Sequence, residues 1–582
     1  MTENEQPNSV SMDMGKMMAG IQQMLGSQLP PEEYGNFQQT ECRIPMPDGI
    51  ALHGTLFRPA ETGSFPVVLM RNPYMGNDMM NTAIYGPAFA KHGYAYLAVD
   101  VRGALKSEGE WLPFENERRD GRAVIDWIAA QSWCDGNIGT MGSSYLGHTQ
   151  WCIADYPHPA LKAMYIGVYG IHPYHTFYRR GMFRPELWTT WAARMMEDNR
   201  WKMMMPPETY ELARKAWEVR PANRLGETLK GKHCGWYEKW ISSTRESDEC
   251  WSGGFWKELE ESINEMRIPV FLHGGWFDIF LRSQIDTFRR LPEAVREKSR
   301  FVIGPWNHSG MTGGCLEYPN EDALGLFQLK SALEWFDYQL KEKEYPHALG
   351  TVEAYQIGQG TWEVWKGGLA QAERQDWYLH ADGIMDRQRR TQGSARSYTY
   401  DPTDPVQTRG GNLLVNNRDP MGTPECSIWQ PDIGSREDVL SFRSEAFDRE
   451  TKLVGSIGCR LWVASGAPAT AFTVKVCEEF ADGRSVNIRD DITDIRWLDD
   501  GRIQDYVPGT LRELELDLVE TCWQIRAGSR LRVDISSSNF PAYHAHPNVT
   551  GGWATAEKTC PARQTVYFDG GYASCLMLPL QT

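Results

Sequence analysis

A serine between two glycines is the first feature of this sequence that could do chemistry. Ser144 lies in the segment Gly142-Ser-Ser144-Tyr-Leu-Gly147, directly after the apolar run Ile138-Gly-Thr-Met141. A nucleophilic serine needs a sharp turn from a strand into a helix, and small neighbours make room for that turn. The usual pattern is G-x-S-x-G, whereas here the second glycine comes one residue late. By itself the pattern predicts either a nucleophilic serine or an ordinary turn.

An aspartate and a histidine follow two later apolar runs. Asp278 ends the loop Gly274-Gly-Trp-Phe-Asp278, and His308 ends the loop Gly304-Pro-Trp-Asn-His308. Because the carboxyl ends of parallel strands meet at one end of a sheet, we expect both side chains close to Ser144. The chain order Ser, Asp, His is the order of an α/β-hydrolase. The neighbouring Ser143 is the weaker candidate, since a methionine and not a glycine stands two residues before it.

The segments around these residues predict the elements that must position them. Before residue 170, buried strands (66–70, 94–99, 138–141 and 162–168) alternate with helical stretches, which favours a doubly wound α/β sheet. From 170 to 263 the pattern is helical and rich in Trp and Met, as in a cap over an apolar pocket. Beyond residue 345, period-2 alternation between turns predicts an antiparallel sandwich.

The predicted fold class is therefore α/β, with an α/β-hydrolase core, an inserted helical cap and a C-terminal jelly-roll β-sandwich. The predicted segments are an N-terminal extension with a short amphipathic helix (1–35), the first part of the core (36–169), the cap (170–263), the second part of the core (264–345) and the jelly roll (346–582). The N-terminal helix has few basic residues on its polar face, so packing on its own domain or on a second subunit is favoured over membrane binding. Whether the protein forms a homo-oligomer stays an open question.

The amino-acid composition limits the classes of molecule that this protein can bind. The formal net charge is −16, which disfavours nucleic acid and anionic membrane surfaces. The twelve cysteines form no C-x-x-C pair, so neither a zinc ribbon nor a dense disulfide framework is expected. The start of the chain lacks the features of a secretory signal, and no long apolar run is present. We predict a cytoplasmic protein that acts on small molecules.

Seven motifs in one order resemble the cocaine-esterase-like (CocE/NonD) hydrolases, which are related to α-amino-acid ester hydrolases, glutaryl cephalosporin acylases and X-prolyl dipeptidyl aminopeptidases. The motifs are Arg71-Asn-Pro-Tyr74, Asp100-Val-Arg-Gly103, Trp133-Cys-Asp-Gly136, Gly142-Ser-Ser-Tyr-Leu-Gly147, Gly275-Trp-Phe-Asp278, Gly304-Pro-Trp-Asn-His308 and Ser536-Ser-Ser-Asn-Phe-Pro541. The resemblance implies the same core, cap and jelly roll as the segmentation above, and G-x-S-Y-x-G is the family's form of the serine turn.

The resemblance also implies roles. Ser144 would be the nucleophile, His308 the general base and Asp278 the group that orients His308. The hydroxyl of Tyr74 and the backbone N–H of Tyr145 would form the oxyanion hole.

The expected substrate follows from the aromatic residues and from one departure from the family. Where α-amino-acid ester hydrolases carry a Glu-Asp pair that holds the substrate's ammonium group, this chain has Phe280 and Leu281, so recognition of a free α-amino group through that pair is disfavoured. An apolar or aromatic acyl group is expected instead. The side chains expected to contact it are Trp188, Trp191, Trp276, Phe277 and Phe280.

The leading interpretation is a serine esterase that forms an acyl-enzyme. An amidase, an acylase or an X-prolyl-type peptidase of the same fold is the alternative, and a non-catalytic binding protein is disfavoured by the intact Ser, Asp, His and Tyr set. We predict neither a cofactor nor a metal. The pairs His172/His175 and His544/His546 have spacings that a metal could use, but no carboxylate or cysteine cluster accompanies either pair in the sequence.

Overall fold

A computed structural model describes residues 29–74, 80–196, 206–321, 326–414, 426–498 and 501–581. The predicted N-terminal helix lies outside these ranges. Within them, no helix combines the length and the apolar character needed to cross a membrane.

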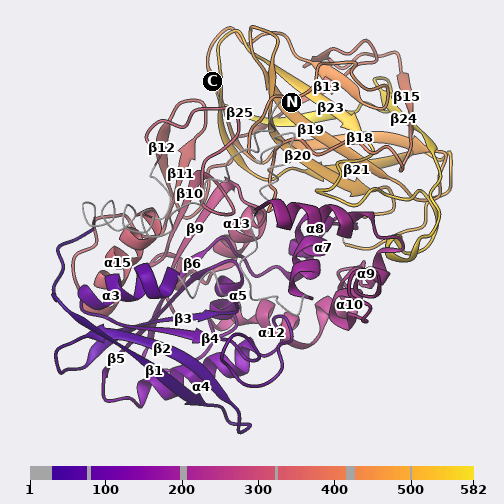
Figure 1. The fold of residues 1–582 in the computed structure, drawn as a ribbon. Helices are drawn as coiled ribbons and strands as arrows, with labels where there is room; N and C mark the ends of the chain where they lie inside the picture. The colour runs from indigo at the N-terminus through magenta and orange to yellow at the C-terminus, as the bar shows by residue number, and fades with distance from the viewer. Residues whose placement is uncertain are drawn as a thin grey trace, which may run out of the picture.

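A ten-stranded sheet forms the centre of the core, in the order β1-β2-β4-β3-β5-β6-β9-β10-β11-β12 (Figure 1). The seven strands from β4 to β11 run parallel, and β1, β2 and β12 pair antiparallel at the two sides. The strands are β1 (Phe37–Pro45), β2 (Ala51–Pro59), β3 (Phe65–Asn72), β4 (Ala95–Asp100), β5 (Cys134–Ser143), β6 (Leu161–Gly167), β9 (Val270–Phe277), β10 (Arg300–Asn307), β11 (Thr351–Gln356) and β12 (Thr361–Lys366). Every residue of β3, β4, β9 and β10 is buried, as expected for strands covered by helices on both faces.

Helices cover the two faces of this sheet (Figure 1). On one face, α3 (Gly86–Lys91) and α15 (Leu326–Lys341) meet through Phe89 and Phe336, whose ring centroids lie 6.2 Å apart. On the other, α4 (Glu117–Ala129) buries Val124, Ile125 and Ile128 against the core beside α5 (Tyr145–Trp151). Apolar residues at helical spacing produce this arrangement, because only one stripe of each helix has to be covered.

The segment between β6 and β9 is mostly helical and lies between the core and the C-terminal domain (Figure 1). Its elements are α6 (Pro173–Phe177), the short hairpin of β7 (Tyr178–Arg179) and β8 (Met182–Phe183), α7 (Pro185–Met195), α8 (Pro206–Glu218), η2 (Ala222–Arg224), α9 (Leu225–Lys230), α10 (Gly235–Ser242), α11 (Glu249–Ser252), α12 (Gly254–Ser262) and η3 (Ile263–Glu265). Aromatic side chains fill the space between these short helices.

The C-terminal domain is an antiparallel β-sandwich. Its larger sheet contains β14-β13-β25-β18-β24-β15 together with β17, β21 and β22, and its smaller sheet is β16-β23-β19-β20. The strands are β13 (Arg374–Leu379), β14 (Met385–Asp386), β15 (Ser394–Tyr400), β16 (Leu440–Arg443), β17 (Thr451–Gly455), β18 (Gly458–Ser465), β19 (Ala471–Glu479), β20 (Ser485–Asp494), β21 (Arg512–Asp517), β22 (Thr521–Ile525), β23 (Arg530–Ser536), β24 (Ala562–Phe568) and β25 (Cys575–Gln581).

Two strands that follow residue 345, the predicted end of the core, extend the core sheet. β11 pairs parallel with β10, and β12 pairs antiparallel with β11, so both strands belong to the core sheet. β12 has no fully buried residue, unlike the central strands of this sheet.

Candidate active site

Ser144 occupies the turn between β5 and α5. Its backbone has φ 59° and ψ −123°, a conformation that is strained for a residue with a side chain. A Cβ on Gly142 would lie 2.4 Å from the Cβ of Leu146, and a Cβ on Gly147 would lie 2.8 Å from the Cβ of Tyr169. The late glycine is therefore the residue that lets the first turn of α5 pack closely on the chain just after β6.

The structure brings Ser144, His308 and Asp278 together in one chain of hydrogen bonds. Nε2 of His308 lies 3.0 Å from Oγ of Ser144, and Nδ1 of His308 lies 2.6 Å from Oδ2 of Asp278. Asp278 is fully buried. The three residues directly follow β5, β10 and β9, so one end of the parallel sheet positions all of them.

Neighbouring polar groups fix the aspartate and the histidine loop. The second oxygen of Asp278, Oδ1, accepts the backbone N–H of Phe280 at 2.7 Å, and Asn412 donates its side-chain amide to the Asp278 carbonyl at 2.6 Å. On the other loop, Oδ1 of Asn307 accepts the N–H of Ser309 at 2.9 Å. Asn412 comes from the C-terminal domain and lacks a sequence motif, so sequence reasoning missed it.

Tyr74 lies just beyond β3, on the same side as Ser144. Both polar groups of the Asn72 side chain bond its backbone: Oδ1 accepts the Tyr74 N–H at 2.9 Å and Nδ2 donates to the Tyr74 carbonyl at 2.8 Å. The Tyr74 hydroxyl accepts the indole N–H of Trp191 at 3.1 Å, which leaves its own proton available for donation. Burial raises the pKa of Tyr74 to about 12, so the hydroxyl stays protonated at neutral pH.

Tyr145 has two polar groups near the site, its backbone N–H and its side-chain hydroxyl. Its backbone N–H belongs to the first turn of α5, where amides have no acceptor within the helix. Its side-chain hydroxyl donates to Oε1 of Glu117 at 3.0 Å, and the other carboxylate oxygen of Glu117 accepts from Arg71 at 3.0 Å. Glu117 is almost completely buried. This buried network explains Arg71 of the Arg71-Asn-Pro-Tyr74 motif, while Glu117 gave no indication of its role in the sequence.

Three of the predicted aromatic residues surround this region. The Phe280 ring lies 5.5 Å from the His308 ring, and the Trp188 ring lies 6.4 Å from Phe280. Trp191 reaches the site through the hydrogen bond of its indole with Tyr74. Their side chains make the wall beside the triad aromatic.

Trp276 and Phe277 were expected to join them, and the structure does not bring them there. β9 continues through Phe277, so both residues point from a strand into the core and not from a loop. Both are fully buried; the indole of Trp276 donates to the carbonyl of Tyr355 on β11 at 2.6 Å, and the ring of Phe277 faces Tyr318. The difference arises because β9 continues through the two glycines that indicated a loop.

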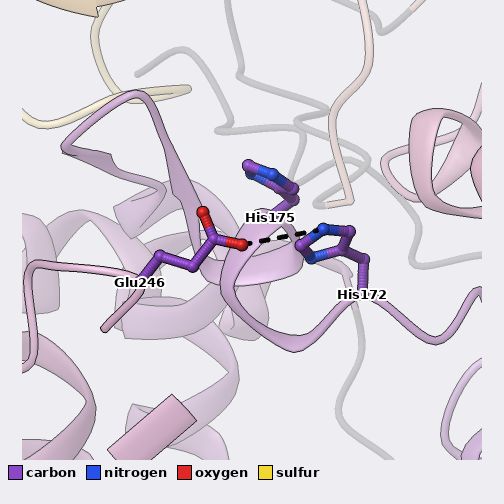
Figure 2. A group of neighbouring side chains, drawn as sticks. All are labelled: His172, His175 and Glu246. Carbon is purple, nitrogen blue, oxygen red and sulfur yellow. Dashed lines mark ion pairs between the residues drawn. The ribbon is translucent and has the colours of Figure 1, made fainter. Parts of the chain in front are cut away.

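The two histidine pairs, His172/His175 and His544/His546, have different acidic neighbours in the structure. The structure places Glu246, from a later loop of the cap, next to His172 and His175 (Figure 2). In the part of the chain that the structure describes, this is the one group of at least three His, Cys, Asp or Glu residues close enough to share an ion. His546 lies near Asp494, with 3.5 Å between Nε2 and Oδ2.

The sheet order, the strained serine turn and the Ser-His-Asp chain define a serine hydrolase of the α/β-hydrolase class. Two family models cover most of the sequence: the X-Pro dipeptidyl-peptidase (S15 family) matches residues 48–310, and the X-Pro dipeptidyl-peptidase C-terminal non-catalytic domain matches residues 347–577. The chain belongs to the S15 family, among its CocE/NonD hydrolases. The family predicted from the motifs is thereby confirmed.

Known relatives extend over almost the whole chain. Cocaine esterase of Rhodococcus sp. is 29% identical over 94% of this chain and 99% of its own. Two solved structures share the fold at 21% identity, each covering 95% of this chain and 98% of its own: an aminopeptidase from a Thaumarchaeota archaeon (TM-score 0.79) and an α-amino acid ester hydrolase (TM-score 0.78).

Proposed function

We propose that this protein hydrolyses carboxylic esters through an acyl-enzyme on Ser144. The observation that carries the proposal is the hydrogen-bond chain from Ser144 Oγ through His308 to Asp278, at 3.0 and 2.6 Å. Such a chain makes a serine hydroxyl nucleophilic, because the imidazole can take its proton while the carboxylate stabilises the imidazolium. The 29% identity to cocaine esterase supports an ester substrate.

The reaction proceeds in two halves. Ser144 Oγ attacks the acyl carbonyl carbon as its proton passes to Nε2 of His308. The tetrahedral oxyanion accepts hydrogen bonds from the Tyr74 hydroxyl and the Tyr145 N–H, and the leaving alcohol departs with the proton held by His308. Water then attacks the acyl-enzyme with His308 as its base, which releases the acid and restores Ser144.

Tyr74→Phe should lower kcat by on the order of 10²–10³-fold. The hydroxyl is a buried, fixed donor that stays protonated, and removal of one oxyanion donor typically costs about that much. The measurement is steady-state hydrolysis of an aryl ester, with KM followed separately, since the lost interaction belongs to the transition state.

Trp191→Phe serves as the comparison for this variant. It keeps an aromatic ring but removes the indole N–H that bonds the Tyr74 hydroxyl. We expect a loss of kcat smaller than that of Tyr74→Phe, and no further loss when the two changes are combined. Near-normal turnover of Tyr74→Phe would remove Tyr74 from the oxyanion hole and leave the role of Ser144 untouched.

An apolar or aromatic acyl group fits the surroundings of the triad best. Phe280 lies against His308, and Leu281, the next residue, is fully buried at the start of α13 (Leu281–Arg290). A carboxylate that could balance an α-ammonium group is therefore missing from both positions. Trp188 and Trp191 add aromatic surface on the cap side.

A peptide or amide substrate is the second candidate, because the matching family is named for an X-Pro dipeptidyl-peptidase. Paired kinetics separate the two. For one aromatic acyl group offered as an ester and as the matching anilide, we expect kcat/KM for the ester to exceed that for the anilide by about a hundredfold or more, a barrier difference of about 2.7 kcal/mol.

A third substrate completes that experiment. An X-Pro anilide with a free amino terminus should be cleaved no faster than the aromatic anilide, since Phe280 and Leu281 offer no charge to its ammonium group. Preference for the X-Pro anilide over the ester would replace the esterase by the peptidase.

A further inference from the structure

The cap contains a second group of chemistry-bearing side chains, apart from the triad. His172 precedes α6 directly, His175 lies within it, and Glu246 lies in the loop between α10 and α11. Each offers one ligand atom, and the three atoms lie within 4.8 Å of one another. Figure 2 shows the carboxylate beside the two rings, with 3.9 Å between Oε1 of Glu246 and Nε2 of His172. We propose that these three side chains bind one divalent metal ion of the zinc type.

Each of the two imidazoles has a nitrogen atom that makes no hydrogen bond with the described residues. Nδ1 of His172 and Nδ1 of His175 are both buried and have no hydrogen-bond partner among the described residues. The two rings lie close together, with 3.9 Å between their centroids. A buried polar atom without a partner is costly, and neutral imidazole is the commonest metal ligand in proteins. Nε2 of His172 is the atom that faces Glu246, and an ion bound there would give the two rings a common partner.

Several arginines lie near the three side chains. Arg282 and Arg290 act on His172, and Arg179, Arg180 and Arg282 act on His175. Arg290, also close to His172, is paired with Glu260 at 3.2 Å, which moderates its repulsion of a cation.

The ligand types select the ion. Two imidazole nitrogens and one carboxylate oxygen suit zinc and its first-row neighbours, and three protein ligands leave a position for water. The His172 side chain is 17% exposed and the Glu246 side chain 41% exposed, so an ion can enter from solvent and keep a water ligand.

The loop that carries Glu246 is already held against α6. The Tyr174 hydroxyl donates to the carbonyl of Thr244 at 2.9 Å, and the indole of Trp251 donates to the carbonyl of Ser243 at 2.6 Å. The three ligand atoms, all within 4.8 Å of one another, would close on an ion by adjustment of their side chains. Binding would cross-link α6 to this loop and so stabilise the cap.

Zinc binding by the chelator-treated protein tests the proposal. Free Zn²⁺ is titrated against a chromogenic chelator, and the stoichiometry of the wild type is compared with that of the double variant His172→Gln/Glu246→Gln. Because free cysteines elsewhere can also bind zinc, the expected result is a difference of one ion per chain. Thermal unfolding in the presence of Zn²⁺ should show a rise of a few degrees in Tm for the wild type and none for the variant.

The matched control is His233→Gln/Glu238→Gln. This pair also lies in the cap, with 2.8 Å between Nδ1 and Oε1, but belongs to no three-ligand group among the described residues. It should bind as many ions as the wild type and show the same rise in Tm. Equal stoichiometry in the wild type and the His172/Glu246 variant would overturn the site, and binding without a rise in Tm would overturn its stabilising effect. Ester hydrolysis of both variants without zinc reports that they fold.

Discussion

Replacing Ser144 with alanine should lower kcat for ester hydrolysis by roughly a millionfold, the size of loss seen when a serine hydrolase loses its nucleophile. The change removes only Oγ, the atom that lies 3.0 Å from Nε2 of His308, and leaves the strained turn between β5 and α5 in place. Without that atom no acyl-enzyme can form. Steady-state kinetics on an aryl ester give the rate, and intact mass after fluorophosphonate treatment shows whether the label is still taken up.

The adjacent Ser143 provides the matched control. Its Oγ is directed toward Gly167 and His273: both Ser143 Oγ and His273 Nε2 would lie 2.2 Å from a Cβ at Gly167. Ser143→Ala should therefore keep its label and most of its activity. Labelling of Ser144→Ala at the wild-type rate, or loss of labelling in Ser143→Ala, would contradict the proposed nucleophile.

Asp278→Asn should lower kcat by about ten-thousandfold with little change in fold. The carboxylate uses both oxygens: Oδ1 accepts the Phe280 N–H and Oδ2 accepts from Nδ1 of His308. An asparagine has one acceptor, which the fixed Phe280 N–H would claim, so its NH₂ group would face His308. The imidazole would then carry its proton on Nε2 and could not accept the proton of Ser144, and such a tautomer change costs about 10⁴-fold in kcat.

Asp286→Asn is the control for this variant. Asp286 lies on the neighbouring helix α13 and is partly buried, but its near partner is Arg289 at 3.8 Å. Its kcat should stay within a few-fold of the wild type, and the Tm of both variants should be measured beside the rates. An Asp278→Asn enzyme that keeps a tenth of the wild-type kcat would remove Asp278 from the triad.

Features of the site that are encoded in consecutive residues could be predicted from the sequence. The serine turn is written in consecutive residues from Gly142 to Gly147, and the loops that end at Asp278 and His308 follow recognisable apolar runs. Parallel strands then bring such loops to one end of the sheet as a matter of geometry. The triad's proximity was predictable for that reason.

The residues that could not be predicted from the sequence are those whose roles depend on contacts between distant segments. Asn412 reaches Asp278 from the C-terminal domain, and Glu246 reaches His172 from another loop of the cap. Neither residue stands in a motif. Trp276 and Phe277 were misplaced for a different reason: the glycines at 274 and 275 indicated a loop, whereas β9 continues through them.

The pairing of β11 with β10 has a consequence for the independence of the two domains. His308 follows β10 directly, and β10 is bonded on its outer side to β11, a strand that comes after the catalytic residues in the chain. A shortened chain ending at residue 345 would retain all three triad residues, yet it would expose the backbone of β10 as an unpaired edge strand. Unpaired edge strands promote aggregation and fraying. The smallest hydrolase unit that this architecture supports therefore extends to the end of β12, at Lys366.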